Sequence, residues 1–170
     1  VGKDAFTYTV TDDVDGSSQA NVTVFTSAFG EHILHFDGSA SQVKVEPTES
    51  LSITGAFTIE SRFYMRGNGE YGEPGFGRIL DKNQISLFSN GKGHAIYPDN
   101  SLVLAIFGPD QQMATANSPS GSLQTGGWHH VAVTYDGATS VRMWIDGNEV
   151  ETSYNVGKII GGVADNRQQP

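Results

Sequence analysis

The feature that most constrains the fold of this chain is an alternation of apolar and polar residues in short segments that turn-forming residues separate. In residues 57–65 (FTIESRFYM), the apolar set consists of Phe57, Ile59, Phe63 and Met65. Alternate residues of a β-strand point to opposite faces, so this set predicts a strand with one buried face. No window of useful length has apolar residues at the helical spacing of i, i+3, i+4 and i+7. The pattern therefore predicts an all-β protein.

Twelve segments carry this signal. In chain order the predicted strands are residues 5–10, 20–26, 32–36, 42–46, 57–65, 78–81, 85–88, 102–107, 112–116, 128–135, 141–145 and 155–160. Asp-Gly, Asn-Gly and Pro-Asp-Asn turns recur between them, and the chain contains 21 glycines. Short strands at this spacing are typical of an antiparallel β-sandwich.

Composition limits the partners and the chemistry. The formal net charge is −9, so bulk electrostatics would not hold a nucleic acid or an anionic membrane. The chain has no cysteine, which excludes disulfides and cysteine-based metal or thiol chemistry. We find no signal peptide and no apolar stretch long enough for a membrane span, and we expect any targeting signal to lie outside this stretch of sequence.

Two predicted strands combine charge with an aromatic ring on the face opposite the apolar set. Arg62 and Tyr64 share that face in residues 57–65. In residues 141–145, Arg142 and Trp144 share it, opposite the predicted core residues Val141, Met143 and Ile145. A sugar can stack its CH face on a ring while its hydroxyls bond to charged groups, so this combination suits carbohydrate. The alternative is a solvated outer face with amphipathic side chains, and the sequence leaves both open.

Adjacent histidines in residues 128–137 (WHHVAVTYDG) raise the question of a metal site. On a strand, His129 and His130 point to opposite faces and cannot hold one ion together. Zinc needs three or four convergent ligands, and no HExxH-type motif is present. We therefore interpret the segment as a packed strand that ends in an Asp-Gly turn, with Trp128 and His130 on one side and His129 on the other.

Two long stretches resemble a known family. LHFDGSASQVKVEPTESLSITGAFTIESRFYM (34–65) and GGWHHVAVTYDGATSVRMWIDGNEV (126–150) resemble the laminin G-like, concanavalin A-like jelly-roll modules of secreted bacterial proteins. The resemblance implies two curved antiparallel sheets packed face to face, with ligands on the concave sheet or at its rim loops. The resemblance runs from about residue 31 to the end of the sequence, and we predict a jelly-roll domain over residues 27–170. Residues 4–24 (DAFTYTVTDDVDGSSQANVTV) resemble the last two strands of a cadherin-like or immunoglobulin-like adhesin repeat. Residues 1–26 are therefore predicted to be a terminal β-hairpin of such a repeat.

The sequence departs from the family pattern at two places. Arg62 stands where related modules carry a tryptophan, and the chain stops before the family's usual final strand. We expect a jelly roll that lacks its last strand and leaves an exposed edge. An open edge recruits a partner strand. The hairpin of residues 1–26 is the favoured partner, and a strand of a second molecule is the alternative, which would give a monomer or a strand-exchanged dimer respectively.

Enzyme motifs are missing, and calcium is the one cofactor that the sequence suggests. Glycosidases need two carboxylates that flank one bond, and no strand carries an ExDxE-like run. We therefore expect no catalytic residues. Calcium prefers the oxygen ligands of Asp-rich turns, and related modules hold calcium in rim loops such as FDGSAS (36–41), so Asp37 is the candidate metal ligand. The alternative is that Asp37 only caps its turn.

These observations predict a non-catalytic carbohydrate-binding or adhesion module of a large extracellular or cell-surface bacterial protein. The ligand-binding candidates are Arg62, Tyr64, Trp144 and, from the glycine-rich loop 66–77, Tyr71. The rival hypotheses are a structural spacer that binds nothing and a fragment of a polysaccharide-degrading enzyme. Neither nucleic acid nor membrane insertion is expected.

Overall fold

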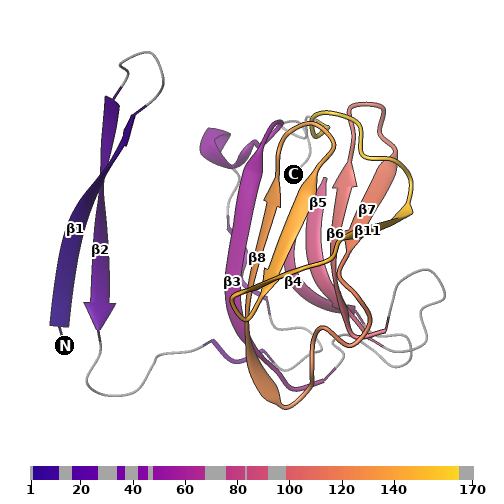
Figure 1. The fold of residues 1–170 in the computed structure, drawn as a ribbon, viewed down its shortest axis with the longest axis horizontal. Helices are drawn as coiled ribbons and strands as arrows, with labels where there is room; N and C mark the ends of the chain where they lie inside the picture. The colour runs from indigo at the N-terminus through magenta and orange to yellow at the C-terminus, as the bar shows by residue number, and fades with distance from the viewer. Residues whose placement is uncertain are drawn as a thin grey trace. The chain divides into compact units, whose positions relative to one another are not determined.

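The computed structural model of the protein describes residues 2–11, 17–26, 34–36, 42–45, 48–67, 76–82, 84–91 and 99–164 (Figure 1). The chain divides into two compact units, Val1–His35 and Phe36–Pro170. The first unit contains strands β1 (Gly2–Thr11) and β2 (Ser17–Thr26), which pair antiparallel with Phe6 opposite Val22. The β-hairpin expected from residues 5–10 and 20–26 is therefore present.

The second unit is a sandwich of two antiparallel sheets, as the alternation predicted. The four-stranded sheet contains β3 (Phe57–Met65), β8 (Gly127–Tyr135), β9 (Val141–Ile145) and β10 (Asn148–Val150), in the order β10-β9-β8-β3. The five-stranded sheet contains β4 (Phe76–Lys82), β5 (Ile85–Asn90), β6 (Ser101–Phe107), β7 (Met113–Asn117) and β11 (Ser153–Val156), in the order β11-β7-β6-β5-β4. Among the described residues, the only helix is the single 3₁₀ turn η1 (Glu49–Leu51).

The core lies between the inner faces of the two sheets. The residues that build it are mostly aliphatic and include Leu87, Leu102, Leu104, Ile106, Val131, Val133, Tyr135 and Met143. In β9 the burial alternates as the sequence predicted, with Val141, Met143 and Ile145 buried. The burial of these apolar side chains away from water provides the main driving force that holds the two sheets together.

Two expectations about the first strands of the sandwich need correction. Phe57, Ile59 and Phe63 face the core as expected, but they are only partly buried, because β3 is an edge strand of its sheet. The described parts of the predicted strands 32–36 and 42–46 are not strands. In them Leu34 is 71% exposed and Val45 is 68% exposed, so period-two alternation alone did not bring these residues into the core.

Tight turns and one returning segment complete the sandwich. Asp146 (φ 52°) and Gly147 (φ 82°) join β9 to β10 with the two positive φ values of a type I′ hairpin turn. The Tyr135 hydroxyl donates to Gly162 O at 3.3 Å and ties β8 to the segment after β11. Burial is the main cause that raises the pKa of this hydroxyl. Within the described residues, no helix has the length and apolar character needed to cross a membrane.

Candidate functional site

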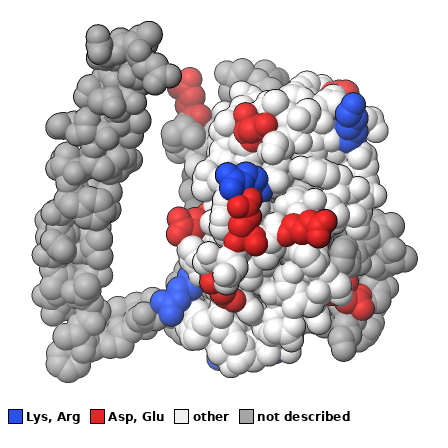
Figure 2. Space-filling view, viewed as in Figure 1, with Lys and Arg blue, Asp and Glu red and all other residues white. Residues whose placement is uncertain are grey.

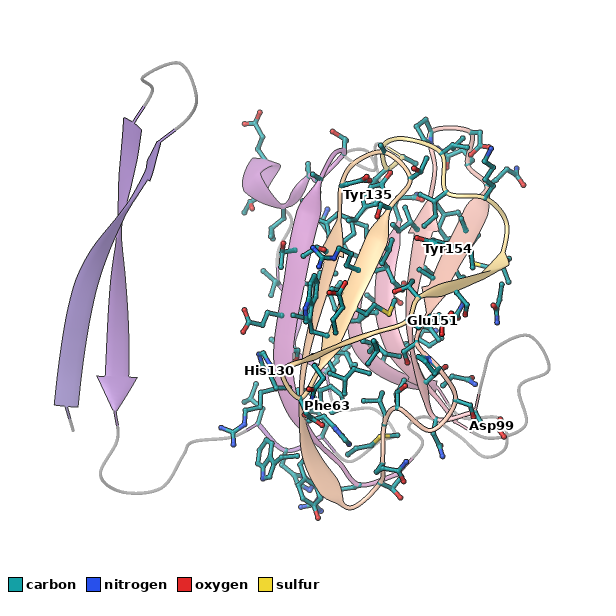
Figure 3. The ribbon with its side chains drawn as sticks, viewed as in Figure 1. Phe63, Asp99, His130, Tyr135, Glu151 and Tyr154 are labelled. Carbon is teal, nitrogen blue, oxygen red and sulfur yellow. The ribbon has the colours of Figure 1, made fainter. Side chains whose placement is uncertain are left out.

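The outer face of the four-stranded sheet carries the aromatic and charged residues that the sequence singled out. The strand register places Arg62 opposite His130, and Tyr64 opposite Trp128. Farther along β8, Ala132 lies between Glu60 of β3 and Trp144 of β9. Figure 3 shows His130 of this face and Phe63 of the opposite, core-facing side on the neighbouring strands β8 and β3. The five-stranded sheet differs. Its strand β7 alternates the core residues Ala114 and Ala116 with Thr115 and Asn117, and both of these polar residues are also fully buried.

One end of the outer face carries the Trp128 cluster, which consists of two aromatic rings, Tyr64 and Trp128, and the guanidinium of Arg62. The Arg62 guanidinium lies 5.0 Å from the centre of the Trp128 ring. Tyr64 meets the same ring edge-on, with 5.7 Å between centroids, and its hydroxyl donates to Gly126 O at 2.8 Å. Trp128 is 41% exposed and Tyr64 is 45% exposed. Large rings with this exposure, held in place by cation–π and edge-to-face contacts, form a fixed apolar surface next to hydrogen-bond donors.

Trp144 forms a second aromatic site on β9. The Arg142 guanidinium lies 4.8 Å from the centre of its ring. Arg142 also forms two hydrogen bonds with the Glu149 carboxylate, at 2.7 Å and 2.8 Å. The hydrogen bond with Arg142 lowers the pKa of Glu149, and the same pair raises the pKa of Arg142. The pair therefore stays ionised and keeps the guanidinium over the ring.

The centre of the face, between the two tryptophans, is polar. His130 Nε2 lies 2.7 Å from Glu60 Oε1, and both side chains are largely open to solvent. In the space-filling view, basic and acidic groups are scattered singly or in small pairs over a mostly uncharged surface (Figure 2). No block of positive charge is visible on the face drawn there. The arrangement suits a neutral, hydroxyl-bearing ligand better than a polyanion.

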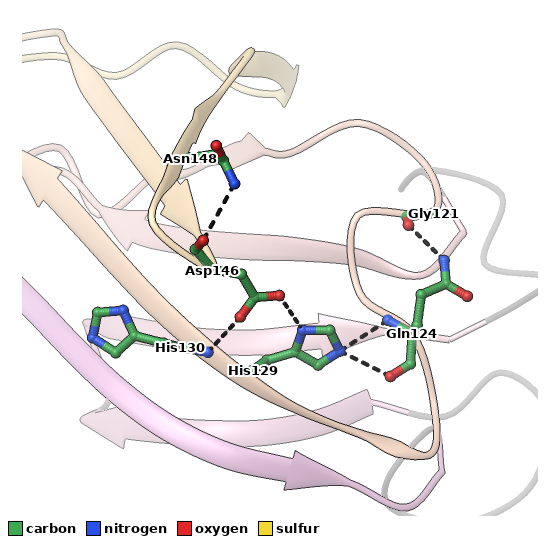
Figure 4. Close-up of polar contacts among 6 residues, drawn as sticks. All are labelled: Gly121, Gln124, His129, His130, Asp146 and Asn148. Atoms are coloured by element: carbon green, nitrogen blue, oxygen red, sulfur yellow. Dashed lines mark hydrogen bonds and ion pairs between the residues drawn. The ribbon is translucent and has the colours of Figure 1, made fainter.

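His129 lies on the other side of β8, beneath this face. It is 6% exposed, and its Nδ1 lies 2.9 Å from Asp146 Oδ2. Asp146 Oδ1 accepts a hydrogen bond from the His130 backbone N–H at 2.8 Å, which is the main cause that lowers the pKa of this carboxyl (Figure 4). The prediction that the two histidines point to opposite faces is confirmed. No group of three or more His, Asp or Glu side chains in the described part of the chain is arranged to hold a metal.

The structure brings together three of the five candidate residues. Arg62, Tyr64 and Trp144 share the outer face, and Arg62 and Tyr64 meet at Trp128. Sequence reasoning did not include Trp128 in the site. The sequence signal that could have identified Trp128 was its position on the same side of the strand as His130. Tyr71 and Asp37 lie outside the described residues.

Comparison with known proteins gives one match. A family model described as the concanavalin A-like lectin/glucanases superfamily matches residues 37–167. No curated protein and no solved structure matches the chain.

Proposed function

Because the chain belongs to the concanavalin A-like lectin/glucanases superfamily, we propose that it is a non-catalytic module that binds carbohydrate through the outer face of the four-stranded sheet. The observation that carries the proposal is the pair of tryptophans on the outer face, exposed Trp128 and half-buried Trp144, each with an arginine on its ring. A guanidinium beside an indole offers N–H donors next to an apolar surface. Sugar hydroxyls and sugar CH groups need that combination.

The spacing of the two tryptophans favours an extended ligand. Trp128 lies four residues from Ala132 on β8, and Ala132 pairs with Trp144. Strand geometry then separates the two backbone positions by roughly 14 Å. The polar pair of Glu60 and His130 lies between the two tryptophans. An oligosaccharide is the ligand whose apolar and polar surfaces alternate over such a length.

The placement of carboxylates supports a non-catalytic role. Glu60 and Glu149 are the acidic side chains at the two ends of one row across the sheet, with Ala132 and Trp144 between them. Three strand spacings separate their backbones by roughly 14 Å, and each carboxylate has a basic partner of its own, His130 for Glu60 and Arg142 for Glu149. A glycosidase instead directs its two carboxyl groups at one bond, about 5–9.5 Å apart. Glu149 is also a poor proton donor, because Arg142 lowers its pKa. Reducing-sugar release from plant and algal polysaccharides tests the rival proposal of an enzyme fragment.

The experiment that tests binding is a glycan array followed by affinity measurements on single variants. A spacer domain gives no hits, whereas a binding module gives a related set of glycans. For a glycan identified in this way, Trp128→Ala should lower the affinity by about 1–3 kcal/mol, as truncating a ring at the centre of an interface does. Trp144→Ala should weaken binding of long glycans more than of short ones.

The matched control is Thr58→Val. Thr58 is an exposed residue of β3 on the same face as Tyr64, but it lies near the opposite end of the strand. The Thr58→Val variant should bind the glycan with the wild-type affinity. If all three variants melt like the wild-type protein and bind equally well, the outer face is not the binding site.

The remaining parts of the proposal concern setting and metal. We propose an extracellular or cell-surface location, with residues 1–26 as the terminal hairpin of an adhesin-like repeat that precedes a jelly-roll domain. Calcium at Asp37 is part of the same proposal. A metal that binds only the native state must raise the melting temperature, so melting curves in EDTA and in added calcium test it. Identical curves at saturating calcium would end the calcium hypothesis.

A further inference from the structure

The His129 ring has an unusual set of partners. Its Nδ1 lies 2.9 Å from Asp146 Oδ2, and its Nε2 lies close to both backbone groups of a single residue (Figure 4). The Gln124 N–H donates toward Nε2 at 3.1 Å, and the Gln124 carbonyl oxygen lies 2.8 Å from the same atom. One nitrogen therefore faces a donor and an acceptor at once.

We propose that His129 is a proton-operated switch: proton uptake at Nε2 exchanges its hydrogen bond from Gln124 N–H to Gln124 C=O and thereby rotates the backbone at Gln124. A carboxylate only accepts hydrogen bonds, so Nδ1 carries a proton in both states. In the neutral ring Nε2 has a lone pair, which accepts from Gln124 N–H and opposes the carbonyl oxygen. In the cation Nε2 carries a proton, which it donates to the carbonyl, and it then opposes the N–H. Each protonation state of the ring therefore satisfies one backbone group of Gln124 and repels the other.

The surroundings of the ring favour a response to its protonation. Asp146 is the one charged side chain in contact with the ring within the described part of the chain, and its low pKa keeps it ionised. From β3 the uncharged Phe63 ring packs at 6.1 Å between centroids. The loop contributes only the Gln124 backbone, and the Gln124 side chain donates to Gly121 O. His130 contributes its backbone N–H to Asp146 and directs its ring to the opposite face, toward Glu60. No second carboxylate in this set competes for the proton on Nε2.

A short chain of contacts links the switch to the outer face. Two residues after Gln124, Gly126 donates its N–H to Met65 O at 2.7 Å and accepts the Tyr64 hydroxyl at its own carbonyl at 2.8 Å. Tyr64 packs edge-on against Trp128. A rotation of the backbone at Gln124 therefore reaches the Trp128 cluster through Gly126, the hydrogen bond from the Tyr64 hydroxyl and the contact between the two rings. The inference goes beyond the proposed function, because it concerns the conformation of the free protein and needs no glycan.

Nuclear magnetic resonance on the His130→Gln variant tests the proposal. This variant removes the imidazole of the adjacent residue, the one other histidine ring near His129 in the part of the chain that the structure describes, so that its signals are not mistaken for those of His129. As the pH is lowered, Nε2 should change from unprotonated to protonated while Nδ1 remains protonated. With the same midpoint, the exchange protection of the Gln124 amide should fall and the Trp128 indole resonance should shift. The Leu123 amide is the internal control, because it donates to Asn100 O and not to the ring; its protection should stay constant.

A second variant separates coupling from a general pH effect. In His129→Gln combined with His130→Gln, the titration of the Gln124 and Trp128 signals should disappear. If that double variant does not fold, the single-variant titration still decides the matter. The proposal is overturned if Nε2 keeps one protonation state over the whole titration. It is also overturned if Nε2 titrates while Gln124 keeps its protection and Trp128 does not shift.

Discussion

The two tryptophans of the outer face differ in how their arginines are held. Arg142 is held by two hydrogen bonds to Glu149 and lies over a ring of its own strand, whereas Arg62 lies over the ring of Trp128 on the neighbouring strand. From the family resemblance we expected a tryptophan at position 62. The protein instead has an arginine there, and its guanidinium covers a tryptophan of the next strand. An aromatic ring is still present at this end of the face, but it is supplied by β8 and not by β3.

Asp146 is a residue whose ionised form the folded state stabilises. The hydrogen bond from the His130 N–H is the largest cause that lowers its pKa, and bonding to His129 adds to it. A group whose pKa is lower in the folded state stabilises the protein above its unfolded pKa, about 3.9 for Asp, and loses that contribution as the pH falls through the folded value.

The predicted variant is Asp146→Asn. Above about pH 5 it should be less stable than the wild-type protein by about 1 kcal/mol, because a half-exposed charged hydrogen bond contributes less than a buried one. As the pH falls from about 4 through the lowered pKa of the folded state, the two proteins should converge in stability, since the wild-type carboxyl then becomes protonated as well. Urea unfolding from about pH 2.5 to 6 measures the difference. A gap that stays constant down to the lowest pH would contradict the ionised Asp146 of this structure.

At the level of elements, two Asp-Gly turns with similar sequence are held differently. Both Gly137 (φ 79°) and Gly147 (φ 82°) have positive φ values. A Cβ at Gly147 would meet nothing within 4 Å, whereas a Cβ at Gly137 would lie 2.8 Å from the Ala56 backbone nitrogen. Gly147→Ala should therefore cost only the backbone strain of about 1–2 kcal/mol. Gly137→Ala should cost more, because backbone must also move. Equal unfolding midpoints for the two variants would contradict the close approach of Gly137 to Ala56.

The strands also differ in how much each contributes to the core. Met143 on β9 is fully buried, whereas Phe63 on the edge strand β3 is only partly buried. Met143→Ala should cost about 2–5 kcal/mol. Phe63→Ala should cost less than the roughly 3–5 kcal/mol of a fully buried phenylalanine. Chemical denaturation of both variants gives the comparison. A larger loss at Phe63 than at Met143 would mean that β3 is covered in solution by a further element.

At the level of the whole molecule, the role of residues 1–26 is decided by deletion. If the hairpin covers an open edge of the sandwich, as the sequence suggested, the shortened protein should melt at a lower temperature or associate through the exposed edge. Light scattering and thermal melting of the protein without residues 1–26 measure both effects. A shortened protein that stays monomeric and melts at the wild-type temperature would show that the hairpin is dispensable for the sandwich.

The sequence alone determined the fold class and the faces of the central strands, because the β-period is short and each strand carries its own pattern. It placed Val141, Met143 and Ile145 in the core, and it separated His129 from His130. It also predicted the tight turn after β9, since few residue pairs tolerate two positive φ values. These features depend on local backbone geometry, which a single stretch of sequence specifies.

Only the tertiary structure decided which residues meet across strands. Tyr64 and Trp128 are far apart in the sequence, and their contact follows from the register of β3 on β8, which no local pattern encodes. The same holds for the bonds of His129 to Asp146 and Gln124, which join a strand, a turn and a loop. It holds as well for the exposure of Val45, whose alternation alone predicted a buried strand. The physical reason is that packing and pairing depend on the whole arrangement of the sheets, whereas periodicity describes one strand at a time.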